Sequence, residues 1–172
     1  MKHNYQKKYK NVLIRQIEQK DIEIMRQWRN NPNNSRYLRK IPFITEEMQI
    51  KWYNNYLYNT DEMCFAIEEI ENLHRVVGSL SLYNFFANQA EYGKVLIGDK
   101  EAHGKNVGVN SLKAVLYIAF TTLKLKRIIL HVYKENIPAV KVYTKVGFKE
   151  IDSYIANGLE EITMEITAQN YR

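Results

Sequence analysis

Several residue types that carry structural information are scarce in this sequence of 172 residues. Cys64 is the single cysteine, so no intramolecular disulfide can form, which fits a reducing compartment. It lies in an apolar, strand-like run, where a free cysteine is usually a small buried residue. Only three prolines and seven glycines occur, which excludes collagen-like and linker-rich segments.

Long apolar runs and concentrated charge are also lacking. No apolar stretch reaches the ~20 residues that a membrane-spanning helix needs, so no membrane partner is expected. Residues 1–10 are basic and polar and lack the apolar stretch of a secretion signal, which predicts a cytoplasmic protein. The net charge of +6 is spread thinly, which favours a small anionic ligand over a nucleic acid. The four histidines are scattered without ligand spacing, so we expect no metal site.

Hydrophobic residues make up 45% of the chain, enough for one sizeable core, and no repeat divides it, so we expect a single domain over residues 1–172. Their spacing predicts strands and helices. The expected strands are 12–17, 63–68, 75–83, 92–97, 127–132, 148–151 and 161–166. The expected helices are 22–30, capped by Asp21, 46–57, capped by Thr45, a long helix after residues 103–108, and 136–145.

The order of these elements predicts a mixed α/β fold, not a doubly wound nucleotide fold. Three consecutive strands indicate an antiparallel meander, and the strand–helix–strand unit over 92–132 indicates one parallel pair. We therefore expect a central mixed, mostly antiparallel sheet of about seven strands, flanked by four helices.

The sharpest local pattern is the turn His103-Gly104-Lys105-Asn106-Val107-Gly108, which opens the long helix. A glycine-bearing turn before a helix leaves backbone N–H groups unpaired, and the helix dipole adds positive potential, so the turn suits a phosphate. Lys105 can add a charge-assisted contact. An ordinary helix start with turn glycines is the alternative. The dinucleotide-binding and triphosphate-binding glycine patterns are absent.

In its context this turn resembles the acetyl-CoA pyrophosphate loop of the GNAT N-acetyltransferase superfamily, whose pattern is Arg/Gln-x-x-Gly-x-Gly/Ala. Gly108 matches, whereas His103 replaces the Arg or Gln and Asn106 replaces the middle glycine. Residues 136–148 resemble the family's Asn-x-x-Ala-x-x-x-Tyr-x-x-x-Gly-Phe signature. Residues 90–98 resemble the strand that splays from its neighbour and receives the pantetheine arm. The order of the three motifs, and of the strands and helices between them, resembles that of the family along nearly the whole chain.

The resemblance implies an enzyme that uses acetyl-CoA as cosubstrate and transfers acetyl to a primary amine by direct attack, without an acyl-enzyme. Tyr143 is the implied general acid, since a phenol of pKa about 10 can protonate a departing thiolate. Glu91 is the candidate base, directly or through water, although a solvated charge at a strand edge is the ordinary alternative. The implied cofactor-binding residues are Val95, Leu96, Ile97, His103, Gly104, Lys105, Asn106, Val107, Gly108, Val109, Asn136 and Lys141.

The acceptor is less well specified. The helix ending in Trp28-Arg29-Asn30 is similar to a GNAT branch that acetylates nucleotide-linked 4-amino sugars, and that branch also contains ribosomal-protein, polyamine and antibiotic acetyltransferases. This similarity implies that Trp28, Arg29, Asn30 and Tyr83 bind the small-molecule amine acceptor. A protein N-terminus, a polyamine or an aminoglycoside stays open as acceptor, as does a non-catalytic acyl-CoA-binding domain. Many relatives dimerise, so a homodimer is compatible with the family.

Charge at the acceptor site would discriminate among these alternatives. An acidic cleft would favour a cationic acceptor, and its carboxylates would come from Glu46, Glu47, Glu68 and Glu91. Basic residues would favour a sugar nucleotide, and the candidates beside Arg29 are Arg36, Arg39 and Lys40.

Overall fold

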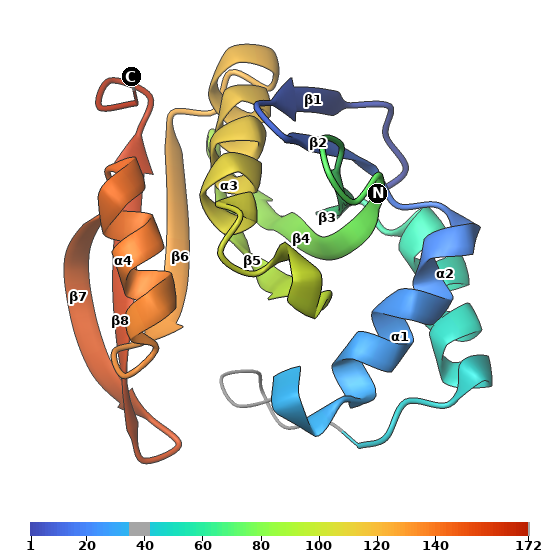
Figure 1. The fold of residues 1–172 in the computed structure, drawn as a ribbon. Helices are drawn as coiled ribbons and strands as arrows, with labels where there is room; N and C mark the ends of the chain where they lie inside the picture. The colour runs from blue at the N-terminus through green and yellow to red at the C-terminus, as the bar shows by residue number, and fades with distance from the viewer. Residues whose placement is uncertain (35–41, 172) are drawn as a thin grey trace.

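A computed structural model of the chain describes residues 1–34 and 42–171. Within them lie an eight-stranded sheet, in the order β1-β2-β3-β4-β5-β6-β8-β7, and four α-helices (Figure 1). The strands are β1 (Gln6–Tyr9), β2 (Val12–Gln16), β3 (Glu62–Glu69), β4 (Arg75–Phe86), β5 (Gln89–Ile97), β6 (Arg127–Tyr133), β7 (Lys149–Ala156) and β8 (Leu159–Thr167). The helices are α1 (Ile22–Asn30), α2 (Glu46–Tyr58), α3 (Val107–Tyr117) and α4 (Ile137–Val146).

The predicted fold class is confirmed. Every neighbouring pair of strands is antiparallel except β5 and β6, which are parallel. The strand that the sequence did not predict is β1, which pairs with β2 through a tight turn in which Lys10 has a φ of 51°. Its residues Gln6–Tyr9 carry three polar side chains and no apolar alternation, so hydrophobic periodicity could not reveal it.

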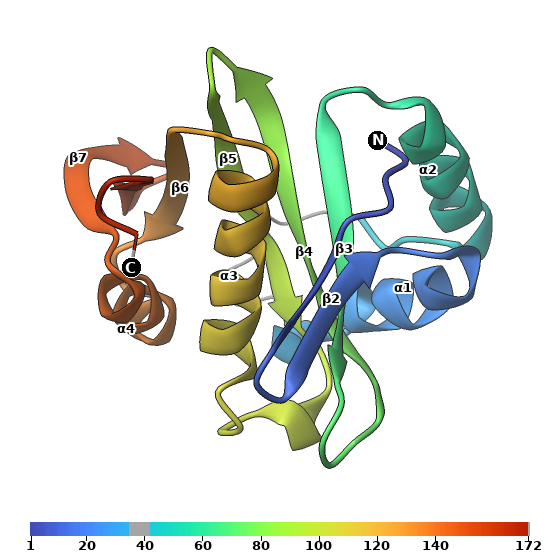
Figure 2. The same cartoon turned by 90° about the horizontal axis from the view of Figure 1, so that it is seen from above.

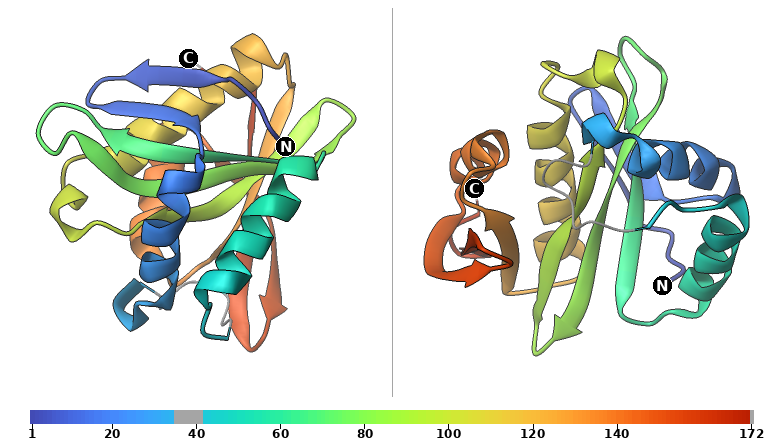
Figure 3. Two further views of the ribbon diagram at one scale, coloured as in Figure 1. Left: turned by 90° about the vertical axis from the view of Figure 1, so that its right-hand side faces the viewer. Right: turned by 90° about the horizontal axis from the view of Figure 1, so that it is seen from below.

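The helices cover both faces of the sheet. α3 packs on one face, and α1 and α2 lie on the other, as Figures 2 and 3 show. Alternate side chains of β3 divide between these layers: Phe65 joins the larger core with Leu112 and Leu116 of α3, whereas Cys64 joins the smaller core with Tyr56 of α2. Cys64 is buried, as expected for a small hydrophobic residue.

The helix ends follow only partly from the sequence. Thr45 caps α2, since its hydroxyl accepts a hydrogen bond from the backbone N–H of Met48 at 3.3 Å, as predicted. Asp21 precedes α1 at the N-cap position, as predicted, but its side chain makes no capping hydrogen bond to this helix. Its carboxylate is almost fully buried and binds the Arg15 guanidinium at 2.7 Å, because a buried charge needs a charged partner. Among the described helices, none is long and apolar enough to cross a membrane.

Candidate active site

The start of α3 presents backbone N–H groups that the helix does not use. The first N–H with a carbonyl partner one turn back is that of Asn110, which donates to the Asn106 carbonyl at 2.9 Å. The N–H groups of Val107, Gly108 and Val109 therefore precede the hydrogen-bond ladder, and they lie at the positive end of the helix dipole.

The turn before α3 uses left-handed backbone positions, and its glycines face open space. Gly104 has a φ of 78° and Asn106 a φ of 58°, conformations that glycine and asparagine tolerate best. Gly108 is different, because it lies within the helix, where glycine costs about 1 kcal/mol relative to alanine. A Cβ at Gly108 would meet no atom within 4 Å, so packing inside the protein does not require this glycine. A ligand that approaches this part of the backbone closely would limit the position to a small residue.

A buried hydrogen-bond network, which the sequence did not reveal, holds this turn in place. The Asn11 amide donates to the Lys105 carbonyl at 3.1 Å and to the Glu69 carboxylate at 3.2 Å, and it accepts from the Asn110 amide at 2.7 Å. Burial alone would raise the pKa of Glu69, but backbone N–H donors, led by that of Leu73, lower it to about 2. An ionised carboxylate thus anchors the network that positions the start of α3.

His103, at the position of the family's Arg or Gln, links the turn to the end of β5. Its Nε2 lies 3.1 Å from the Ile97 carbonyl. A carbonyl oxygen can only accept, so we assign the proton to Nε2. Lys105, two residues on, has an exposed side chain that is available to an anion.

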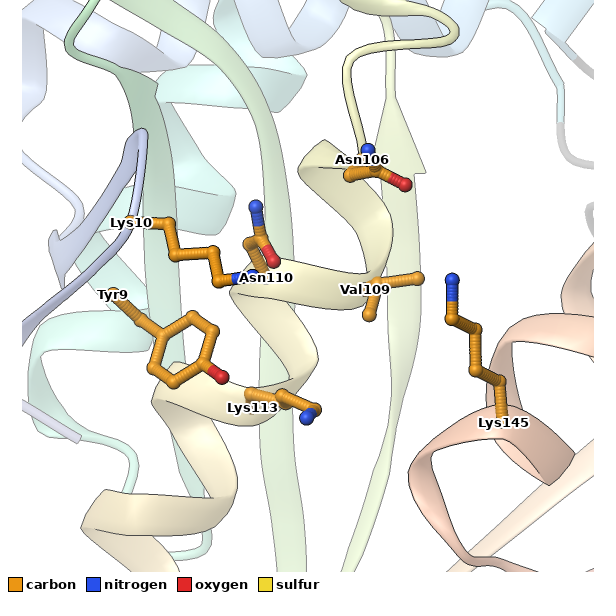
Figure 4. Close-up of a pocket in the computed structure, with 7 residues that line it drawn as sticks. All are labelled: Tyr9, Lys10, Asn106, Val109, Asn110, Lys113 and Lys145. Atoms are coloured by element: carbon orange, nitrogen blue, oxygen red, sulfur yellow. The ribbon is translucent and has the colours of Figure 1, made fainter.

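A basic pocket of about 220 Å³ lies beside the same helix end (Figure 4). Figure 4 shows Lys145 extending from α4 beside Val109, with Lys10 on the other side of α3. Among the described residues, no carboxylate pairs with Lys10, Lys113 or Lys145, so the pocket has positive potential. The three lysines lie far apart in the sequence, which is why no local pattern identified them. The pocket is lined by Tyr9, Lys10, Asn106, Val109, Asn110, Lys113 and Lys145.

Strands β5 and β6 are paired only briefly and then separate. Their register ends at the pair Glu91–Ile129, although β5 continues to Ile97 and β6 to Tyr133. In β5, Lys94 has a φ of 52°, and the register with β4 shifts there. The backbone of residues 92–97, which includes Val95 and Leu96, therefore has no strand partner on its β6 side. An extended ligand arm can form hydrogen bonds to such an edge.

The second motif that resembles the family, residues 136–148, forms α4 and both of its ends. The Asn136 side chain caps the helix by accepting from the Ala139 N–H at 3.4 Å, and Pro138 lies in the first turn. Gly147 ends the helix with a φ of 111°. Lys141 is exposed on the helix surface.

Tyr143 of α4 lies half-buried between two aromatic rings. The rings of Tyr92 and Phe148 each lie 6.0 Å from its ring, centroid to centroid. Burial raises the pKa of Tyr143 to about 12, so the phenol keeps its proton at neutral pH. A general acid must be protonated before it acts, and Tyr143 meets that condition.

On the sheet face toward α1 and α2, Tyr83 and Glu91 form a cross-strand pair of β4 and β5. The Tyr83 ring lies over Gly93, where an added Cβ would be 2.7 Å from the phenol oxygen. The Lys94 ammonium lies 4.9 Å from the centre of the Tyr83 ring. Glu91 accepts a hydrogen bond from the Asn84 amide at 3.1 Å. The structure thus brings two predicted site residues together where β5 and β6 begin to separate.

In the Trp28-Arg29-Asn30 stretch, Trp28 and Asn30 make contacts within the protein, whereas Arg29 has no ion-pair partner among the described residues. Trp28 is 8% exposed and packs so closely on Gly98 that a Cβ there would overlap its indole ring. The Asn30 side chain donates to the Ile44 carbonyl and accepts from the Ile44 N–H, both at 2.9 Å, which holds the chain leading into α2. Arg29 is partly buried, and no carboxylate pairs with it in the part of the chain that the structure describes. Burial lowers the pKa of Arg29.

The carboxylates that the sequence analysis named for a cationic acceptor are not gathered around Glu91. Glu68 pairs with Arg15 at 2.6 Å and lies six residues along β3 from Glu62, which is about 20 Å. Glu62, opposite Tyr83, is itself paired with Lys94 at 2.6 Å. Glu46 and Glu47 are exposed in the first turn of α2. The basic candidates Arg36, Arg39 and Lys40 lie outside the described residues.

Known proteins resemble this chain in sequence and in fold. Residues 11–149 match the acetyltransferase (GNAT) domain family. Spermidine N(1)-acetyltransferase of Vibrio cholerae is 28% identical over 152 residues, which cover 86% of each chain. A crystal structure of spermidine N-acetyltransferase from the same organism, with CoA and spermine, has a TM-score of 0.82 at 26% identity and covers 94% of this chain and 98% of that one.

A third similar protein is FdhC, described as a nucleotide-linked sugar GNAT. Its apo structure has a TM-score of 0.82 at 23% identity and covers 98% of this chain and 93% of that one, a likeness of fold. The family match spans most of the chain, and it includes the turn before α3, the separation of β5 and β6, and Tyr143 of α4. The chain therefore belongs to the GNAT family of acetyltransferases.

Proposed function

We propose that this protein transfers the acetyl group of acetyl-CoA to the primary amine of a nucleotide-linked 4-amino sugar. The observation that carries the choice of acceptor is Arg29, a partly buried guanidinium without a carboxylate partner among the described residues. Burying an unpaired charge costs free energy, which an anionic ligand would recover. A diphosphate, which accepts the planar guanidinium in a bidentate manner, is such a ligand.

The cofactor side of the site suits acetyl-CoA, which supplies an acetyl thioester. The N–H groups of Val107, Gly108 and Val109 would hold the pyrophosphate, with Lys105 and the lysines of the basic pocket adding charge. The β5 edge over residues 92–97 would bind the pantetheine arm, and the N–H of Val95 or Leu96 would polarise the thioester carbonyl. Asn136 and Lys141 would contact the same arm from α4.

Two side chains would move protons during transfer. Tyr143 would protonate the departing sulfur, because its raised pKa keeps it in the acid form. Glu91 would take a proton from the amine, directly or through water, on the face toward α1. Tyr83, which lies beside Glu91, would stack on part of the acceptor. Direct attack needs no nucleophile from the protein, and the one cysteine is buried in the smaller core.

A polyamine is the second candidate acceptor. The similarity to a spermidine acetyltransferase at 28% identity favours it. The charges of this chain favour it less, because Glu62 and Glu68 are both neutralised by ion pairs, whereas Arg29 forms none within the described part of the chain. A cationic acceptor would meet an uncompensated positive charge beside α1.

A thiol-release assay with acetyl-CoA and a panel of amines tests the proposal. The panel contains a UDP-linked 4-amino sugar, spermidine, an aminoglycoside and a ribosomal N-terminal peptide. We expect turnover with the sugar nucleotide and, for Arg29→Gln, a KM for that acceptor raised about tenfold or more.

Arg26→Gln is the matched control for Arg29→Gln. Arg26 lies one turn earlier on α1 and is already paired with Glu23 at 2.7 Å, so its loss should leave the KM unchanged. Turnover with spermidine alone would contradict the proposed acceptor. Binding of CoA by calorimetry, without turnover of any amine, would contradict catalysis and favour a binding domain.

A further inference from the structure

A polar cluster on strands β6, β7 and β8 has no role in the mechanism above. We call it the His131 cluster, and it consists of His131, Tyr154, Glu161 and Thr163. The register places His131 opposite Thr163 and Tyr154 opposite Glu161, so three adjacent strands bring the four side chains to one face of the sheet. The Glu161 side chain is only 9% exposed, which is costly for a carboxylate unless polar groups surround it.

The polar contacts that His131 makes in the cluster all involve Nδ1 of its ring. The Tyr154 hydroxyl donates its single proton to Glu161 at 2.5 Å. Its oxygen, 3.5 Å from Nδ1 of His131, can then only accept from the ring, whereas the Thr163 hydroxyl, 3.1 Å from the same nitrogen, can donate or accept. We assign the proton to Nδ1, which can donate to the Tyr154 oxygen, and the lone pair to Nε2, for which no hydrogen-bond partner lies among the described residues.

The alternation of side chains along β6 places His131 on the sheet face that also carries Glu91, which we call the acceptor face because the amine is proposed to bind there. Ile128 and Leu130 of β6 are buried in the larger core beneath α3 and α4, so Ile129 and His131 point to the opposite face. Glu91 lies on that same face, because its neighbours Ala90 and Tyr92 also belong to the larger core. The last β5–β6 pair is Glu91–Ile129, so His131 lies about 7 Å beyond it, on the segment of β6 that has separated from β5.

We propose that His131 is a catalytic residue whose Nε2 takes a proton from the acceptor nitrogen. This inference rests on the proposed function and deepens it. An amine that arrives as an ammonium ion loses one proton before its lone pair forms the C–N bond, and a second one to become the amide. The C–S bond breaks and the sulfur gains one proton, so one proton is released in net.

Glu91 and His131 divide these two protons on the acceptor face. His131 takes the first proton and passes it to solvent, since its side chain is 34% exposed. Glu91 takes the second. Glu161, whose carboxylate oxygen lies 4.0 Å from Nδ1, is a positioning residue that stabilises the imidazolium. Among the described residues, this face also presents the charged groups of Asp152 and Lys149 of β7 and the ion pair of Arg127 with Glu165.

The variant His131→Gln, assayed with acetyl-CoA and the amine that the wild type turns over best, tests this role. We expect kcat/KM to fall on the order of 10²-fold, with CoA binding unchanged by calorimetry. Added imidazole should restore part of the lost rate, which loss of a merely structural side chain would not allow. The control is His74→Asn in the exposed β3–β4 turn, where the φ of 50° suits asparagine, and it should keep full activity.

Two results would overturn the proposal: a His131→Gln enzyme with wild-type kcat/KM, or a loss of rate that imidazole does not relieve. Should His131→Gln fail to fold, judged by its circular dichroism and melting temperature, His131→Asn is measured in the same way. A wild-type protein that turns over no amine would refute the proposed function instead, so the two failures are distinguishable.

Discussion

Helices α3 and α4 both border the proposed cofactor site, yet they are anchored in different ways. The buried residues of α3 are Val107, Asn110, Ser111, Leu112, Ala114, Val115 and Leu116. No residue of α4 is fully buried, and the helix is held by half-buried contacts such as those of Tyr143. The helix that would hold the phosphates is therefore part of the core, whereas the helix that carries the candidate acid packs on its edge. We therefore expect α4 to open locally at a lower free-energy cost than α3.

Core substitutions test this difference with the largest expected effect. Leu112→Ala, at a fully buried position of α3, should lower the free energy of unfolding by about 2–5 kcal/mol. Val142→Ala, at a half-buried position of α4, should cost about 1 kcal/mol. Urea denaturation followed by circular dichroism measures both. Equal losses would mean that the two helices are anchored equally.

Tyr143→Phe tests whether the loosely anchored helix carries the chemistry. We expect kcat to fall about 10²-fold or more, with the CoA dissociation constant and the free energy of unfolding nearly unchanged. The pKa of Tyr143, raised to about 12, adds a pH expectation. The acid form persists up to about that pH, so kcat should show no alkaline decline from this residue between pH 7 and 10. A variant that keeps its full rate would remove Tyr143 from the mechanism.

Linkage gives the same residue a stability signature. The folded state binds the Tyr143 proton more tightly than the unfolded chain does, whose tyrosines titrate near pH 10. Its contribution to stability is therefore complete below pH 10 and is lost as the pH rises from 10 through about 12. The free energies of unfolding of wild type and Tyr143→Phe should therefore be similar below pH 10 and diverge above it, where the wild type becomes the less stable of the two.

Substitutions at Gly108 separate binding from stability on α3. A Cβ there meets no protein atom, so Gly108→Ala should raise the free energy of unfolding by up to about 1 kcal/mol and keep CoA binding. Gly108→Val projects a branched side chain toward the proposed pyrophosphate position and should raise the dissociation constant of CoA about tenfold or more. Calorimetric titration decides between these outcomes. If CoA binds both variants equally well, the pyrophosphate does not approach Gly108.

The smallest change in CoA affinity is expected from substitutions in the basic pocket beside α3 and α4. Lys145→Ala should weaken CoA binding about three- to tenfold at low salt and less at high salt, because the contact is exposed and screened. Lys149→Ala, on the exposed strand β7 outside the pocket, is the matched control. An identical affinity and salt dependence in both variants would exclude the pocket from phosphate binding.

Elements with strong apolar periodicity were predictable, and those fixed by polar contacts were not. α1 was predicted with its observed bounds, but not the role of Asp21, because the choice between a cap and an ion pair depends on Arg15 of a different strand. β1 was missed because its polar side chains carry no alternation, and its only sheet partner is β2. The network of Asn11, Glu69 and Asn110 joins residues 99 positions apart at its widest, beyond any local pattern.

By itself, the sequence determined the family motifs, the order of the helices and of every strand except β1, and the identity of the candidate acid, since each depends on neighbouring residues and on their spacing. Only the tertiary structure decided where β5 and β6 part, which arginine of α1 has no carboxylate partner among residues 1–34 and 42–171, and which lysines share a pocket. It also brought His131 to the face of Glu91. These features depend on strand register and on charges paired across distant segments, and folding alone brings such groups within a few ångströms of one another.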